Sequence, residues 1–153
     1  MSAKEVFEVR EALFYEEIEN GSVRCLLCPR HCVIDKGQVG FCRTRKNVDG
    51  VLYTLIYGRL SSIATDPIEK KPLYHYHPGT KILSVGTWGC NMSCPWCQNH
   101  EISQGTPQTQ KVDPERLVHI ALDRNSPGIA YTYNEPMIWF EFVLDTSRMA
   151  SAD

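Results

Sequence analysis

Three cysteines in one short stretch of the chain are the residues best suited to chemistry. The stretch reads Cys90-Asn-Met-Ser-Cys94-Pro-Trp-Cys97, with three residues between the first two thiols and two between the last two. A four-iron cluster normally takes four cysteine thiolates, so three from one loop leave one iron free to bind a small molecule. The spacing therefore predicts a [4Fe-4S] cluster that acts as a reaction centre rather than only as an electron carrier.

A second group of cysteines lies upstream and predicts a second metal site. Its members are Cys25, Cys28, Cys32 and Cys42, and His31 adds a further candidate ligand. Four thiolates are enough for structural zinc or for a closed iron–sulfur cluster, and the sequence leaves both open. The spacing of these four cysteines resembles that of a zinc knuckle more than that of the cysteines that bind the cluster of a ferredoxin. Unliganded buried thiols are the third alternative.

Length and composition indicate one ordinary soluble domain without an obvious polyanionic partner. The chain has 153 residues, of which 42% are hydrophobic and 22% charged, with a net charge of −2. Such a charge argues against nucleic acid or an anionic membrane surface as a partner. No apolar run approaches the ~18 residues of a membrane span, and the charged N-terminus is unlike a secretory signal. We therefore expect a cytoplasmic protein, in which seven cysteines are metal ligands rather than disulfides.

The first half of the chain predicts short β-hairpins. Asn20-Gly21 and Asp49-Gly50 are two-residue turn signals flanked by apolar and β-branched residues. The proline-containing segment from Asp66 to Thr80 is expected to be an irregular connection. Residues 1–80 are thus predicted to form a β-hairpin module that carries the four-cysteine site. Its basic residues Arg43, Arg45 and Lys46 are interpreted as a solvated strand edge.

The second half predicts alternating strands and helices. Residues 81–85 and 128–133 have the apolar character of buried strands, while Asp113-Pro114 and Pro136 each begin a helical pattern. A βαβα order implies a parallel sheet with right-handed crossovers. A parallel α/β barrel takes about 250 residues. The fold class is therefore predicted as α/β, with residues 81–153 forming the first, truncated units of a partial (β/α) barrel.

Both candidate motifs of this half follow directly after a predicted strand. The cysteine stretch follows the strand at residues 81–85, and Asn134-Glu135-Pro136 follows the strand at residues 128–133. Sites on parallel sheets gather where the strands end at their carboxyl termini. Each motif therefore lies at a position where a binding or active site is expected.

The motifs resemble those of a known enzyme family. Cys-x3-Cys-x-aromatic-Cys at residues 90–97 is similar to the signature of radical S-adenosylmethionine enzymes. The longer string at residues 90–100 and Tyr131-Thr-Tyr-Asn-Glu-Pro136 resemble homologues of the pyruvate formate-lyase activating enzyme. The spacing of Cys25, Cys28, Cys32 and Cys42, with Gly37 and Gly40, resembles the radical SAM branch of the AmmeMemoRadiSam system. Full proteins of this family are roughly twice as long, which fits a partial barrel.

The resemblance implies a radical mechanism. Cys90, Cys94 and Cys97 would hold three irons of the cluster, and S-adenosylmethionine would chelate the fourth. One electron from a flavodoxin- or ferredoxin-like donor would cleave the cofactor to a 5′-deoxyadenosyl radical, which abstracts a hydrogen from the substrate. If the role is that of a glycyl-radical-enzyme activase, the substrate is another protein. No residue is identified here as a catalytic acid or base.

The resemblance also implies three cofactor-binding residues. Trp96 corresponds to an aromatic beside the adenine, and a core tryptophan is the alternative. Glu135 corresponds to an acidic residue that follows paired glycines in relatives and lies near the cofactor ammonium. This chain has Tyr133 and Asn134 in place of the two glycines, and Asn134 is taken with Glu135 as a cofactor-binding residue. The alternative for Glu135 is a first-turn helix acid.

Two other hypotheses compete with the radical enzyme. One is a two-site zinc-binding module, in which a residue such as His100 completes the set of three cysteines. The other is a truncated copy that keeps the motif without turnover. For a truncated chain we also expect marginal stability, because apolar faces between Met137 and Met149 would lack part of their cover.

Overall fold

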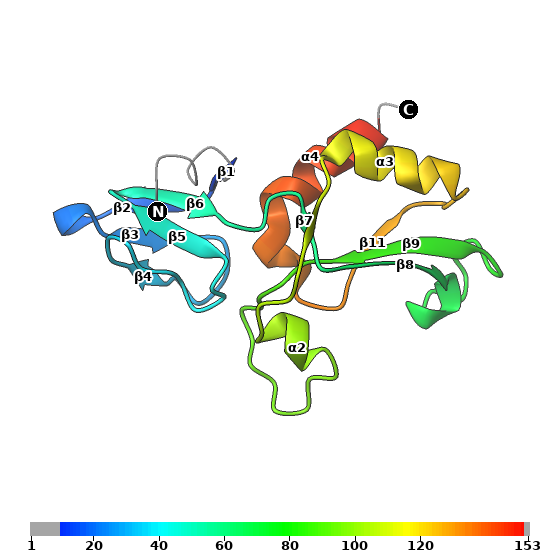
Figure 1. The fold of residues 1–153 in the computed structure, drawn as a ribbon, viewed down its shortest axis with the longest axis horizontal. Helices are drawn as coiled ribbons and strands as arrows, with labels where there is room; N and C mark the ends of the chain where they lie inside the picture. The colour runs from blue at the N-terminus through cyan, green and yellow to red at the C-terminus, as the bar shows by residue number, and fades with distance from the viewer. Residues whose placement is uncertain (1–9, 152–153) are drawn as a thin grey trace.

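Short antiparallel strands joined by tight turns make up the N-terminal part of the chain (Figure 1). The structure, a computed structural model, describes residues 10–151. Two small sheets of three strands each are formed here, with the strand orders β2-β3-β4 and β1-β6-β5. The strands are β1 (Arg10–Glu11), β2 (Tyr15–Glu17), β3 (Val23–Cys25), β4 (Val33–Ile34), β5 (Arg45–Val48) and β6 (Val51–Thr54).

Both predicted hairpins are confirmed. β2 pairs antiparallel with β3 around the short 3-10 helix η1 (Glu19–Gly21), and β5 pairs antiparallel with β6. The turn between β5 and β6 has φ of 52° at Asp49 and 93° at Gly50, a left-handed conformation that Asp and Gly adopt readily. β5 begins at Arg45, because residues 41–44 form a turn and a bend rather than a strand.

A second part of the chain contains the predicted parallel strands. β11 (Ile129–Tyr131) lies parallel to β9 (Lys81–Gly86), with Ala130 opposite Ser84. A third strand, β8 (Ser62–Pro67), pairs antiparallel on the other side of β9 and was not predicted. Its residues are half-buried, and it ends at a proline, which an edge strand tolerates because one side of its backbone needs no partner.

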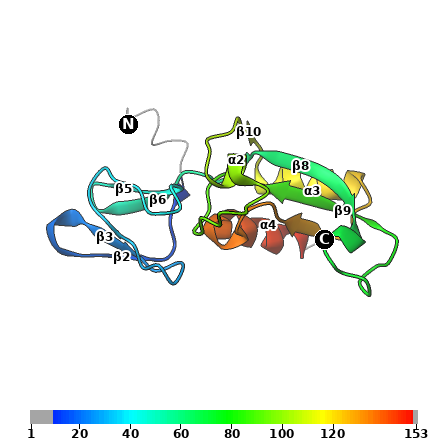
Figure 2. The ribbon, with the colours of Figure 1, turned by 90° about the horizontal axis from the view of Figure 1, so that it is seen from below.

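Two helices cover one face of this sheet (Figure 2). α3 (Pro114–Asp123) begins where predicted, with the Asp113 side chain accepting a hydrogen bond from the Arg116 N–H. The second predicted helix starts as the 3-10 helix η3 (Pro136–Trp139) and continues as α4 (Phe140–Ala150). The core between helices and sheet is apolar and fully buried, with members Ile56, Leu60, Leu83, Val85, Leu117, Ile138, Trp139 and Phe142.

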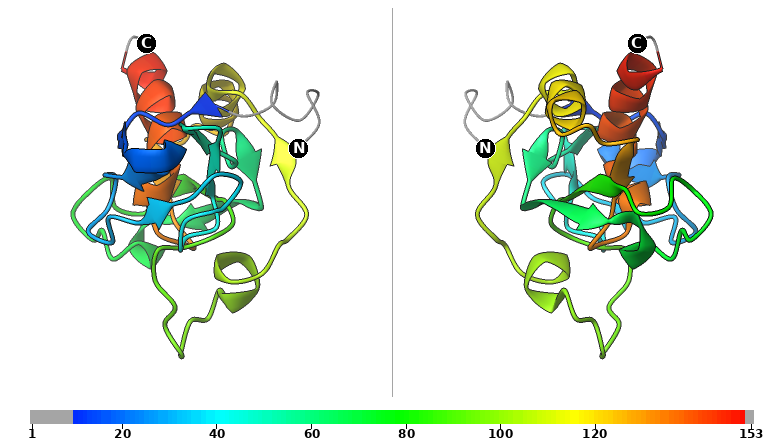
Figure 3. Two further views of the ribbon diagram at one scale, coloured as in Figure 1. Left: turned by 90° about the vertical axis from the view of Figure 1, so that its left-hand side faces the viewer. Right: turned by 90° about the vertical axis from the view of Figure 1, so that its right-hand side faces the viewer.

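The remaining elements are small. The short helix α2 (His100–Ser103) lies on the side of the sheet opposite α3 and α4 (Figure 3). β7 (Arg59–Leu60) pairs antiparallel with β10 (Gln110–Lys111), and the 3-10 helix η2 (Ile68–Lys70) follows β8. The described residues thus form a mixed α/β structure with small sheets and no closed barrel. None of the helices within residues 10–151 combines the length and apolar character needed to cross a membrane.

Candidate metal and cofactor site

The three-cysteine loop leaves the carboxyl end of β9 and leads into α2. Cys90 is buried, whereas Cys94 and Cys97 are half-buried. Turn hydrogen bonds shape the loop, since the Cys97 N–H donates to the Cys94 carbonyl and the His100 N–H donates to the Cys97 carbonyl, each at 3.2 Å. The Cys97 sulfur lies 3.3 Å from the Ser103 hydroxyl. The three thiols therefore come from a short loop that begins after β9 and is turned by two hydrogen bonds of its own backbone.

Side-chain amides join this loop to the end of β11. The Asn134 amide nitrogen donates to the Gly89 carbonyl at 2.8 Å, and its oxygen accepts from the Thr87 N–H at 3.4 Å. The Asn99 amide donates to the Tyr133 carbonyl at 2.8 Å. The two candidate motifs thus meet at the carboxyl ends of neighbouring parallel strands. Asn99 was missed by the sequence analysis, because only the folded chain brings it to β11.

The three residues expected to contact a cofactor occupy different settings. Trp96 is 83% exposed, so the alternative of a core tryptophan is wrong. Asn134 uses both ends of its amide to hold the loop. Glu135 is half-buried and caps η3 by accepting a hydrogen bond from the Met137 N–H at 3.1 Å. Glu135 is thus the N-cap residue before η3 rather than an acid of its first turn, and its role toward a cofactor stays a prediction.

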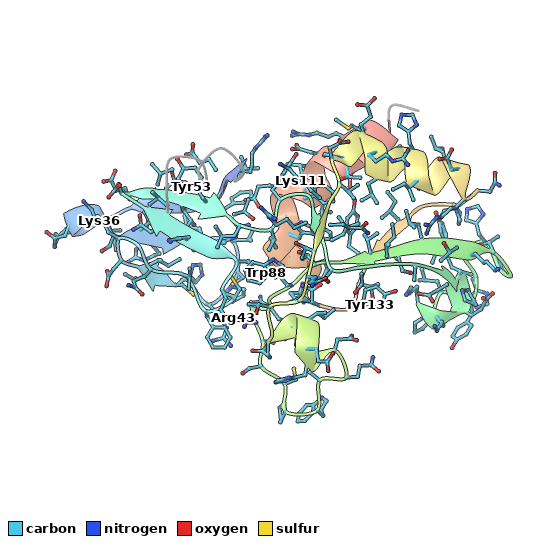
Figure 4. All side chains as sticks on the ribbon, viewed as in Figure 1. Lys36, Arg43, Tyr53, Trp88, Lys111 and Tyr133 are labelled. Atoms are coloured by element: carbon cyan, nitrogen blue, oxygen red, sulfur yellow. The ribbon has the colours of Figure 1, made fainter. Side chains whose placement is uncertain are left out.

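An open groove adjoins the loop on the side of β8. Its volume is about 880 Å³, and its walls come from β8, from the residues just after Cys97 and from Tyr133; they include Ser62, Ala64, Asn99, His100 and Glu101. Binding sites for small molecules usually have volumes of about 300–1,000 Å³. Figure 4 shows Tyr133 close to the junction of the sheet and the α2 segment. Burial, together with the Asp66 carboxylate 3.3 Å from the hydroxyl, raises the pKa of Tyr133.

The four upstream cysteines line one small cavity. Cys25, Cys28, Cys32 and Cys42 all contribute to its wall, and its volume is about 20 Å³. Burial is the main cause that raises the pKa of the Cys25 thiol. His31 is exposed and does not line this cavity. The structure therefore gathers the four thiols that the sequence grouped together, from two segments of the chain.

Two further residues that line the same cavity have buried polar atoms without hydrogen-bond partners. Arg45 and Asn91 line it, and the Arg45 Nε and Asn91 Oδ1 atoms are buried with no hydrogen-bond partner. A buried donor such as Arg45 Nε suits the negative charge of metal-bound thiolates, so the donor set fits a metal–thiolate centre. Within residues 10–151, no group of three or more Cys, His, Asp or Glu side chains is arranged to hold a metal ion as it stands.

The interpretation of the basic residues as a solvated strand edge is wrong for Arg45 and Arg43, whereas Lys46 is half-buried on the edge strand β5. Arg45 is fully buried, and its guanidinium donates to both carboxylate oxygens of Glu141 on α4 at 3.0 and 2.7 Å. Arg43 donates to the Ser103 carbonyl at 2.7 Å and also to the Gln104 carbonyl. Residues of β5 and the preceding turn thus attach the N-terminal module to α4 and to the three-cysteine segment, which periodicity alone could not reveal.

Comparison with known proteins identifies a relative but not a family. The chain is 49% identical over 145 residues to an uncharacterized protein of Methanocaldococcus jannaschii, and the match covers 93% of this chain. The same match covers 44% of the relative, so the chain spans less than half of that protein's length. No family model matches the chain. No solved structure matches it either.

Proposed function

We propose that the chain belongs to a radical S-adenosylmethionine enzyme and that Cys90, Cys94 and Cys97 hold its [4Fe-4S] cluster. The observation that carries the proposal is the junction of the two motifs. The three-cysteine loop and the segment after β11 are joined by the Asn134 and Asn99 amides at the carboxyl ends of two parallel strands. This is the edge of a parallel sheet at which cofactors usually bind.

The chain's own residues supply placement for such a cofactor. Cys90 is buried and Cys94 and Cys97 are half-buried, so a cluster would be anchored in the protein at Cys90 and more accessible at the other two ligands. When bound, the cluster and S-adenosylmethionine supply one-electron cleavage and a hydrogen-abstracting radical. The groove of about 880 Å³ beside the loop is large enough for a nucleoside-sized ligand and an adjoining substrate group.

For the upstream cysteines we propose a single metal ion, with zinc as the favoured metal. The cavity volume of about 20 Å³ is close to that of one or two water-sized spheres. A tetrahedral zinc ion would take all four thiolates as ligands, at Zn–S distances of about 2.3 Å. The Thr44 hydroxyl, which donates to the Cys42 sulfur at 3.2 Å, is a ready partner for a metal-bound thiolate.

Metal analysis combined with EPR tests the proposal. The chain is reconstituted anaerobically with iron and sulfide in the presence of one equivalent of zinc, reduced, and measured with and without S-adenosylmethionine. We expect about four irons and one zinc per chain. We also expect an EPR signal that changes on adding the cofactor.

Two cysteine variants serve as matched controls for each other. Cys97→Ser should lose the EPR signal and keep the zinc, while Cys28→Ser should lower the zinc content. About eight irons per chain would make the upstream site a second cluster. Two zinc ions and no iron signal would refute the radical enzyme and favour the two-site zinc module. A cofactor-responsive signal without 5′-deoxyadenosine formation would support the non-catalytic copy.

The electron donor and the substrate belong to the same proposal. A flavodoxin- or ferredoxin-like protein would deliver the electron, and a protein substrate would follow if the enzyme is an activase. Formation of 5′-deoxyadenosine with reduced flavodoxin, compared with dithionite as the reductant, checks the first point.

A further inference from the structure

The four-cysteine module and the three-cysteine loop are in direct backbone contact. Gly89 precedes Cys90 and has φ of 82°. A Cβ at this position would lie 2.6 Å from the Cys42 carbonyl oxygen and 2.3 Å from the Thr44 methyl. Only glycine permits both this conformation and this approach. The backbone that leads into one cysteine group is therefore packed against the backbone of the other.

Two arginines from the four-cysteine module hold the loop that carries the other three. Arg30 lies between Cys28 and Cys32 in the sequence, and its Nε donates to the Asn91 carbonyl. Arg43 directly follows Cys42 and donates to the carbonyls of Ser103 and Gln104. Hydrogen bonds from charged donors are stronger than those between neutral groups. The arginines thus bind the start of the three-cysteine loop and the end of the helix α2 that follows it.

The contact is reciprocal at Asn91. This residue belongs to the three-cysteine loop, but it lines the cavity of the four upstream cysteines, and its side-chain oxygen is buried without a hydrogen-bond partner. Arg30 lines the same cavity, and its guanidinium lies 3.5 Å from the centroid of the Phe41 ring. One residue from the loop and one from the module therefore face the same small space.

We propose that a metal ion bound by Cys25, Cys28, Cys32 and Cys42 positions the three-cysteine loop, and that Arg30 and Arg43 are the positioning residues. The inference rests on the metal site proposed above. Metal–sulfur bonds fix the two short segments that carry the thiols, and each arginine is within two residues of at least one of these thiols. When these segments are held in place, Arg30 and Arg43 are held in place as well. Arg30 then fixes the Asn91 carbonyl in the loop, and Arg43 fixes the Ser103 and Gln104 carbonyls at the end of α2.

Hydrogen exchange with zinc alone tests this coupling without a cluster or activity. The full chain carrying Cys94→Ser, which disables the three-cysteine loop as a competing zinc site, is compared with and without one equivalent of zinc. We expect one zinc per chain and slower amide exchange over residues 89–104, by at least about fivefold, the lower end of usual coupling between two sites. Slower exchange confined to residues 25–45 would overturn the proposal.

Arginine variants in the same background separate positioning from mere folding. Arg30→Met with Arg43→Met should still bind one zinc but lose the slowing over residues 89–104. The matched control is Arg24→Met, which removes an arginine of the same module from an exposed ion pair with Glu16. It should keep the slowing. A double arginine variant that keeps it as well would overturn the assignment of these residues.

Iron content then distinguishes this inference from the proposed function. With all seven cysteines present, the double arginine variant should take up less iron on reconstitution or give a broader EPR signal than Arg24→Met does. If the native chain takes up no iron but zinc still slows loop exchange, the cluster proposal fails and the coupling stands. If zinc does not bind at all, the coupling fails, and iron uptake at the loop is judged independently.

Discussion

Removing either partner of the buried Arg45–Glu141 ion pair should destabilise the chain by about 3–5 kcal/mol, because the other charge is then left uncompensated. The two side chains are 1% and 2% exposed, and both guanidinium nitrogens of the fork donate to the carboxylate, at 3.0 and 2.7 Å. Glu141 also accepts a hydrogen bond from the Leu13 N–H at 3.0 Å. The pair thus joins α4 to the N-terminal module.

A double-mutant cycle measures the pair directly. Arg45→Met and Glu141→Gln are made singly and together, since glutamine keeps an acceptor for the Leu13 N–H. Each single change should lower the midpoint of thermal unfolding by about 6–20 °C, taking about 2–4 °C per kcal/mol for a chain of this size. The double variant should lose less than either single one, because no uncompensated charge remains.

Urea unfolding in the presence of a chelator is the appropriate assay, since Arg45 also lines the four-cysteine cavity and bound metal would add its own stability. Arg24→Met is the control, because its ion pair with Glu16 is 45% and 47% exposed and should contribute less than about 1 kcal/mol. The reasoning would be refuted if Arg45→Met and Glu141→Gln lowered the unfolding free energy by no more than Arg24→Met does. It would also be refuted if the two single losses of unfolding free energy simply added in the double variant.

Three further predictions concern single positions. Gly89→Ala should destabilise the chain more than Gly37→Ala. Both glycines have positive φ, but only a Cβ on Gly89 would meet other atoms, at 2.3 Å from Thr44. Equal shifts in the urea midpoint of the two variants would contradict this close contact. Burial, followed by a hydrogen bond to a carboxylate, raises the pKa of Tyr57 from 10.0 to about 12. The stability that the protonated Tyr57 contributes is complete below pH 10 and is lost as the pH rises toward 12. The unfolding free energy of Tyr57→Phe should therefore fall less over this interval than that of the native chain. An identical fall in the two proteins would exclude the effect. Asp113→Ala should cost about 1 kcal/mol, because its side chain caps α3 through a 2.7 Å hydrogen bond, while Asp113→Asn should cost less; the unfolding free energies of the two variants check this.

Local sequence signals predicted much of the secondary structure. The Asp-Gly dipeptide at residues 49–50 predicted its hairpin because few residues adopt the backbone conformation that the turn requires. Asp113-Pro114 predicted the start of α3 because both residues satisfy the first turn of a helix. The parallel pairing of β9 and β11 followed from the order of elements.

Other features depended on contacts between distant residues. β8 has only weak strand character, and its pairing with β9 supplies the stability that its own residues lack. Arg45 looked like a surface residue because its partner Glu141 is 96 residues away in the sequence. No local pattern distinguishes a solvated arginine from a buried one with a distant carboxylate.

The candidate site divides in the same way. The sequence by itself determined which cysteines form two groups, because ligand spacing within a short loop is a local property. Only the tertiary structure decided that the groups touch, that Gly89 packs on Cys42, and that Arg30 and Arg43 reach the second loop. The reason is physical: such contacts are formed by chain segments that meet after the sheets and helices have packed, and their sequence separation leaves no local signal.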